Sequence, residues 1–334
     1  MEVFSIIAVH YKYKKHNIAL SSLGFSSTYF IFNRALVKLN VLNEYNPLHD
    51  TLTSHPKPLL GPSSAHGYSN MPGTYILRHY DRYNKDVYAE SKVTILDDGT
   101  RDVGASATMI TDKVFVFGDS FVFGEGVSDE HTFTFLLQQQ NRDKKFYLHA
   151  AGGWSLSNAL VNIRKLKKEI NKDDIIILGY ADFYKLRHVA APKRMKEYGN
   201  PRNILPNGLG HLKVSTDETF TNKIEIISLF CENLRSYCEQ PNPSKEYMEK
   251  ITRNIINEIA STLDARIILL HFYGDLTDPA LDGLASNIEV VPATSSTFKY
   301  EIRDNILNLD GHPGPFWHYA MFSRLNKIIN ARVN

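Results

Sequence analysis

Residues 113–127 read KVFVFGDSFVFGEGV, and this stretch limits the folds open to the chain. Four consecutive apolar residues, 114–117, run directly into Gly118, Asp119 and Ser120. A short apolar run between turn signals is typical of a strand that is buried on both faces of a parallel sheet. Open α/β sheets bind their ligands beyond the carboxyl ends of the strands. We therefore interpret Ser120 as a candidate nucleophile at the end of a buried strand.

From residue 112 onward, strand-like and helix-like segments alternate. Expected strands cover 113–117, 145–150, 174–180, 265–272 and 288–292. Expected helices cover 131–141, 156–170, 218–238, 245–262 and 315–331, with a loop-rich insertion at 184–217. Such alternation predicts an α/β fold with a parallel, doubly wound sheet and right-handed crossovers. The predicted strand order is 2-1-3-4-5.

The first 110 residues lack this alternation. We predict an N-terminal accessory region at 1–110 and a catalytic domain at 111–334, a division that suits a chain of 334 residues. Within the accessory region, 1–45 carries helical spacing and 46–75 is rich in Pro, Gly, Ser and His. We expect the latter to be an extended surface loop, followed by a small β layer at 74–110.

Composition and charge argue against some classes of partner. The formal net charge is +2 and no basic stripe is present, which argues against a nucleic-acid partner. The two cysteines, Cys231 and Cys238, are expected to be reduced thiols in a helix. Residues 17–33 carry no charge and follow a basic segment, an arrangement that loosely resembles a signal anchor. They contain several serines and asparagines, however, and are shorter than the roughly 20 apolar residues that a spanning helix needs. We expect a buried or surface-lying helix in a cytoplasmic protein; the alternative is an N-terminal membrane anchor or export.

A serine nucleophile needs a base, and the base needs an orienting partner. Asp310 and His312 lie in the turn-rich segment LDGHPGP, after the fifth expected strand and just before the last helix. We predict that His312 takes the Ser120 proton and that Asp310 holds the imidazole. The alternatives are that His312 is an ordinary turn histidine and that Asp310 caps the helix.

A developing oxyanion needs hydrogen-bond donors. Gly153 follows the second strand, and its backbone amide is predicted to form an oxyanion hole with the amide of Ser120. The alternative is a plain strand-to-helix turn, which would also favour glycine. No cofactor is implied, and no histidine has partners at metal-ligand spacing, so no metal site is expected.

Together these segments resemble the SGNH/GDSL hydrolases, in a bacterial esterase or O-acetyltransferase-like branch. The first block matches Gly118-Asp119-Ser120, the second Gly153, the third the segment 179–182 and the fifth Asp310 and His312. The resemblance covers residues 112–332. It implies a flavodoxin-like three-layer α/β/α sandwich and a serine esterase that works through an acyl-enzyme. The α/β-hydrolase elbow G-x-S-x-G is absent, because residue 122 is Val122.

The sequence departs from this family in two places. Ala181 replaces the third-block asparagine, whose side chain donates to the oxyanion. Loss of one such donor costs about 3 kcal/mol of transition-state stabilisation, and Asn158 or a backbone amide could substitute. Leu309 stands three residues before His312, so Asp310 and His312 form an Asp-x-His pair that resembles polysaccharide O-acetyltransferases.

Further polar and aromatic side chains flank the expected site. Asp119 is predicted to stabilise the turn before Ser120 or to line the pocket, and Asp182 to line the pocket or anchor its loop. Trp154 and Trp317 could form a wall that stacks on sugars, or pack in the core.

We predict a serine esterase that removes acyl groups, with acetyl the expected group, from a small-molecule or glycan ester. One alternative is an O-acyltransferase that passes the same acyl group to a polysaccharide. Another is a weak or inactive glycan-binding protein, since Ala181 removes a donor. Membrane association is not favoured.

Overall fold

The computed structural model describes residues 52–56, 59–80, 87–105, 110, 112–198, 210–216, 222–228, 237–272, 277–293 and 312–331. The chain divides into two units, Met1–Pro47 and Leu48–Asn334, and every described residue belongs to the second. The expected N-terminal helix, Cys231 and Asp310 lie outside the described residues. A domain boundary near residue 110 stays a prediction.

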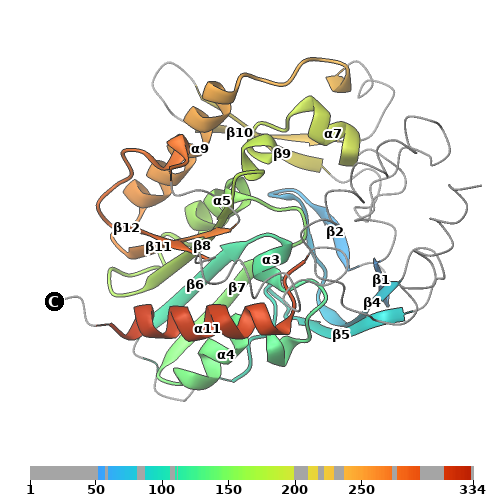
Figure 1. The fold of residues 1–334 in the computed structure, drawn as a ribbon, viewed down its shortest axis with the longest axis vertical. Coiled ribbons are helices and arrows are strands. Elements are labelled where there is room, and N and C mark those ends of the chain that lie inside the picture. The colour runs from blue at the N-terminus through green and yellow to red at the C-terminus, as the bar shows by residue number, and fades with distance from the viewer. Residues whose placement is uncertain are drawn as a thin grey trace, which may run out of the picture. The chain divides into compact units, whose positions relative to one another are not determined.

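Five parallel strands form the central sheet. They are β6 (Asp112–Gly118), β7 (Lys144–Ala150), β8 (Ile175–Ala181), β11 (Arg266–Phe272) and β12 (Ile288–Pro292). Their order across the sheet is β7-β6-β8-β11-β12, which is 2-1-3-4-5 along the chain and confirms the prediction (Figure 1). Every residue of β8 is buried, because helices cover both faces of the sheet.

Four long helices supply the two covering layers. They are α4 (Phe133–Gln140), α5 (Leu156–Leu166), α9 (Lys245–Thr262) and α11 (Pro315–Asn330). Figure 1 shows α4 and α11 on one side of the sheet and α5 and α9 on the other. Side chains fix three of the four N-termini: Thr132 caps α4, Ser155 caps α5 and Ser244 caps α9. The three-layer sandwich is therefore as expected, and no helix within the described ranges is both long and apolar enough to cross a membrane.

The described part of the N-terminal region is built from short antiparallel strands. These are β1 (Leu52–His55), β2 (Leu60–Ser63), β3 (Gly67–Asn70), β4 (Gly73–Tyr80) and β5 (Val87–Ile95). Pairing of β4 with β5 confirms the predicted β layer. The expectation of a surface loop at 46–75 is wrong where the structure describes it, because β2 and β3 form a hairpin whose Tyr68 and Asn70 are buried. Tyr68 Oη donates to the carbonyl of Gly152 at 2.9 Å, and Asn70 Nδ2 to that of Ala150 at 2.8 Å.

One buried arginine joins the β layer to the segment that follows Ser120. Arg101 is fully buried and its Nε lies 2.8 Å from Asp129 Oδ1. Its guanidinium also donates to the carbonyls of Phe123, of Gly124 at 2.9 Å and of Val127 at 2.6 Å. These bonds fix the backbone of 123–127 against the β layer.

The insertion after β8 has more regular structure than the sequence indicates. It contains α6 (Tyr184–His188), α7 (Pro192–Tyr198), β9 (Gly210–Thr216) and β10 (Asn222–Ser228). The prediction of a helix over 218–238 is wrong at 222–228, where β10 pairs antiparallel with β9. The expectation of loop at 184–217 is also wrong in its described parts. Short 3-10 turns lie at Asp129–His131 and Pro279–Leu281.

Candidate active site

Ser120 stands where β6 ends and the short helix α3 (Ser120–Phe123) begins. Asp119 caps this helix, since its Oδ1 accepts from the Phe121 amide at 3.0 Å. The turn is tight: a Cβ on Gly118 would lie 2.2 Å from Val122 Cγ2, so only glycine fits there. The turn holds Ser120 in a fixed place at the carboxyl end of the sheet.

His312 meets Ser120 from the other end of the chain. Its Nε2 lies 3.0 Å from Ser120 Oγ, which confirms the prediction that the two side chains converge. The Phe121 ring is perpendicular to the imidazole, with 5.6 Å between the two centroids. An Nε2 without a proton can accept the Ser120 hydroxyl hydrogen, as a general base does. The orienting role of Asp310 stays a prediction, because that residue lies outside the described residues.

The loop that carries Gly153 lies beside the Ser120 turn. β6 and β7 pair in register, Gly118 opposite Ala150, so the loops that follow them leave the same edge of the sheet. Gly153 has a φ of +78°, a left-handed conformation that favours glycine. A Cβ on Gly152 would lie 3.1 Å from Glu125 Oε2, which places this loop against the segment after α3. The position suits an oxyanion donor, and that role stays a prediction.

Arg187, on α6, ties these two loops together. Its Nη1 donates to Asp119 Oδ2 at 2.9 Å and to the carbonyl of Trp154 at 2.7 Å. The Asp119 side chain is fully buried and that of Arg187 is 9% exposed, so the ion pair is shielded from water. The guanidinium also lies over the Phe183 ring at 4.6 Å. The pair links the residue before Ser120 to the residue after Gly153. Sequence reasoning missed it, because nothing local couples residue 187 to residue 119.

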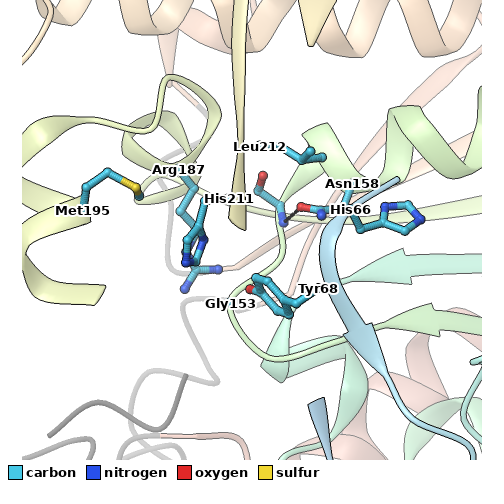
Figure 2. Close-up of a pocket in the computed structure, with 9 residues that line it drawn as sticks. His66, Tyr68, Gly153, Asn158, Arg187, Met195, His211 and Leu212 are labelled. Carbon is cyan, nitrogen blue, oxygen red and sulfur yellow. Dashed lines mark hydrogen bonds between the residues drawn. The ribbon is translucent and has the colours of Figure 1, made fainter. Parts of the chain in front are cut away.

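A small polar cavity opens beside Gly153, and Figure 2 shows the side chains around it. Its lining includes Asn158, Arg187 and two imidazoles, those of His66 and His211. Burial, followed by the charges of Arg187 and Arg194, lowers the pKa of His211 to about 3. Burial lowers the pKa of His66 to about 4, so both rings are neutral at physiological pH.

Asn158, a candidate for the missing oxyanion donor, has a structural task. Its Oδ1 accepts from the Ser155 amide at 3.1 Å, the dashed line in Figure 2, and completes the capping box of α5. It lines the same cavity as Gly153. Whether its amide also reaches an oxyanion stays a prediction.

The third loop begins at Ala181, the last residue of β8, and continues with Asp182. The Asp182 side chain is half exposed and its Oδ1 lies 3.0 Å from Nε2 of His271, which is buried. With Asp278, these two residues bring potential metal-ligand atoms within 4.8 Å of one another. Both Asp278 oxygens, however, already accept hydrogen bonds, from Tyr180 Oη at 2.7 Å and from Lys185 Nζ at 2.6 Å. The lysine ammonium offsets the charge of the Asp278 carboxylate.

Neither tryptophan offers a ring face to a substrate. Trp154 is 6% exposed and its Nε1 donates to the carbonyl of Tyr68 at 3.2 Å. Trp317 is 1% exposed and packs against Phe272 and Phe133. The prediction of a sugar-stacking wall is therefore wrong, and both rings pack in the core. Burial of such large apolar rings stabilises the fold, which exposure in a pocket would not do.

A further carboxylate lies at the reacting atoms. Glu125 Oε1 is 3.8 Å from His312 Nε2, the nitrogen that contacts Ser120. The residue is 9% exposed. Sequence reasoning missed Glu125, although a signal was present: within 113–127, the only other acidic residue is Asp119, and an isolated charge among apolar residues and glycines is unusual.

No family model matches this sequence, and no curated protein matches it. Solved structures do show similarity. A member of the lipolytic G-D-S-L family from Veillonella parvula is 14% identical with a TM-score of 0.37, covering 66% of this chain and 98% of its own. A psychrotrophic esterase from a Pseudoalteromonas species is 13% identical with a TM-score of 0.36, covering 66% and 100%. An acetylxylan esterase from Geobacillus stearothermophilus is 13% identical with a TM-score of 0.34, covering 67% and 96%. These similarities are weak, and the chemistry of the site follows from its own geometry.

Proposed function

We propose that this protein is a serine esterase that hydrolyses acyl esters through an acyl-enzyme on Ser120. The supporting observation is the 3.0 Å contact between Ser120 Oγ and His312 Nε2, at the carboxyl edge of a parallel sheet. Two segments 192 residues apart in the sequence supply this pair. A nucleophile and its base at hydrogen-bond distance are the minimum that acyl transfer to serine requires.

In this mechanism His312 Nε2 takes the Ser120 proton while Oγ attacks the ester carbonyl carbon. The tetrahedral intermediate carries its negative charge on the former carbonyl oxygen, and the amides of Ser120 and Gly153 are its proposed donors. When the intermediate collapses, the alcohol leaves with the proton from Nε2. Water then attacks the acyl-enzyme, gives its proton to His312 and releases the carboxylic acid. Ser120 regains its proton and the cycle closes.

Ala181 leaves this oxyanion hole without a side-chain donor from the third loop. A missing donor costs about 3 kcal/mol, or roughly a hundredfold in rate. We accordingly propose a slow esterase on simple aryl esters, with an acetyl group on a carbohydrate as the preferred substrate. If a sugar hydroxyl replaces water as the acceptor, the same acyl-enzyme would make the protein a transferase.

Labelling of the serine tests the proposal. An uncharged fluorophosphonate should label wild-type protein on Ser120, and labelling should be lost in Ser120→Ala and slowed at least about a hundredfold in His312→Gln. Ser286→Ala, at an exposed serine outside the site, is the matched control. A folded wild-type protein that is not labelled, or a Ser120→Ala variant that still is, would refute the esterase. Acetyl partition between water and added glycan then separates hydrolysis from transfer.

A further inference from the structure

Glu125 is held rigidly next to the reacting atoms. The residue before it, Gly124, ends α3 in a left-handed conformation with a φ of 81°. The Glu125 amide donates to the Ser120 carbonyl at 3.0 Å, and Arg101 Nη1 donates to the Gly124 carbonyl at 2.9 Å. A Cβ on Gly124 would meet Thr132 Cγ2 at 2.9 Å, so the turn has no room to shift. The backbone on both sides of Glu125 is therefore fixed relative to Ser120.

The carboxylate of Glu125 is largely buried but still reaches solvent, and the described part of the chain supplies no hydrogen-bond donor to it. The residue is 9% exposed, and His312 Nε2 lies 3.8 Å from Oε1, beyond hydrogen-bond length. On its other side, Oε2 lies against the backbone of Gly152. A buried carboxylate is costly unless it is hydrogen-bonded. A hydroxyl of a bound molecule can replace solvent as the donor to this carboxylate.

The chemistry of the proposed esterase tells which part of the substrate can supply this donor. The alcohol oxygen of the ester must come within hydrogen-bond distance of His312 Nε2, because it leaves with that proton. Glu125 Oε1 is 3.8 Å from the same nitrogen, so an alcohol oxygen that approaches Nε2 comes close to this carboxylate. We expect a hydroxyl on the carbon adjacent to the ester-bearing carbon to reach this carboxylate.

The charges of His312 and Glu125 indicate what charge the alcohol can carry. His312 becomes a cation when it takes the serine proton, so the attraction of a cationic alcohol to Glu125 is offset by its repulsion from the imidazolium. An anionic alcohol would be repelled by Glu125 itself. We propose that Glu125 binds a neutral hydroxyl adjacent to the ester and so selects esters of polyhydroxylated alcohols, the class that includes sugars. The inference deepens the proposed function and rests on it.

A matched pair of substrates isolates this contact. Ethylene glycol monoacetate differs from ethyl acetate by one hydroxyl next to the ester. Wild-type protein should show a kcat/KM at least about tenfold higher for the glycol ester, the size expected for a hydrogen bond to a charged group. The preference should shrink in Glu125→Gln and disappear in Glu125→Ala. Ethyl acetate, which makes no such bond, is the reference ester, so the preference is the ratio of the two kcat/KM values measured on the same variant. Glu130→Gln, at an exposed glutamate on the same segment, should keep the full preference.

A second readout does not depend on turnover. Ethylene glycol should slow fluorophosphonate labelling of Ser120 in wild type and in Glu130→Gln, but not in Glu125→Ala. Any of three results would overturn the inference. The kcat/KM ratio of glycol ester to ethyl acetate could be near one in wild type, or it could stay high in Glu125→Ala. Acetylcholine could also be turned over faster than the glycol ester. If Ser120 is labelled while the preference is near one, the esterase stands and only the role of Glu125 fails. Absence of labelling refutes the esterase, and with it this inference.

Discussion

Replacement of Arg187 by methionine tests whether the two loops of the site depend on one buried ion pair. Methionine keeps most of the side-chain length and removes the charge. The fully buried Asp119 carboxylate then loses the donor that lies 2.9 Å away, and the Trp154 carbonyl loses a donor at 2.7 Å. Removing one partner of a buried ion pair costs about 3–5 kcal/mol, because the other charge stays buried without compensation. We expect Arg187→Met to lower the free energy of unfolding by that amount.

The assay is urea denaturation of four proteins: wild type, Arg187→Met, Asp119→Asn and the double variant. Asparagine can still accept from the Phe121 amide and cap α3, but it carries no charge. The double variant should therefore be more stable than Arg187→Met by about 2 kcal/mol or more. We expect kcat to be below the wild-type value in both Arg187→Met and the double variant, with little change in KM. Both variants lack the link between the Ser120 and Gly153 loops. A loss below about 1 kcal/mol in Arg187→Met, or a double variant no more stable than that single variant, would refute the reasoning.

Two further predictions concern stability. Arg101→Met should destabilise the fold by about 3–5 kcal/mol in urea, because Asp129 and the three carbonyls that Arg101 binds lose their donor; a loss below about 1 kcal/mol would contradict this. Burial, helped by the charge of Arg101, lowers the pKa of His318 from 6.5 to about 3. Between those two values the unfolded chain binds a proton that the folded one refuses, so stability falls with falling pH, by about 2 kcal/mol at pH 5 from this group. His318→Asn keeps an acceptor for the Phe133 amide and does not titrate, so the stability lost between pH 7 and pH 5 should shrink by about 2 kcal/mol. An unchanged loss would assign the pH dependence to other groups.

Much of the core fold follows from local sequence patterns. The runs before Ser120, in β8 and at Ile267–Leu270 of β11 are apolar, because both faces of the sheet are covered. Turn formers after these runs mark the edge where the loops converge. That is why Ser120 and His312 could be paired from the sequence. The pattern failed at β10, whose strand conformation depends on pairing with β9 and not on its own periodicity. It also failed at β2 and β3, where turn-forming residues close a hairpin.

The remainder of the site was decided by the tertiary structure. Arg187 and Asp119 are 68 residues apart, and Arg101 reaches Asp129 across 28. A lone charged residue has no periodicity, so its partner is known only when the chain has folded. Only the observed burial shows that the two tryptophans pack in the core, since an indole that could line a pocket can equally fill a core. The sequence by itself determined the sheet and the Ser120–His312 pair, because both depend on patterns of neighbouring residues. Only the tertiary structure placed Glu125 against His312 and Arg187 between the two loops, because those contacts join segments that no local rule connects.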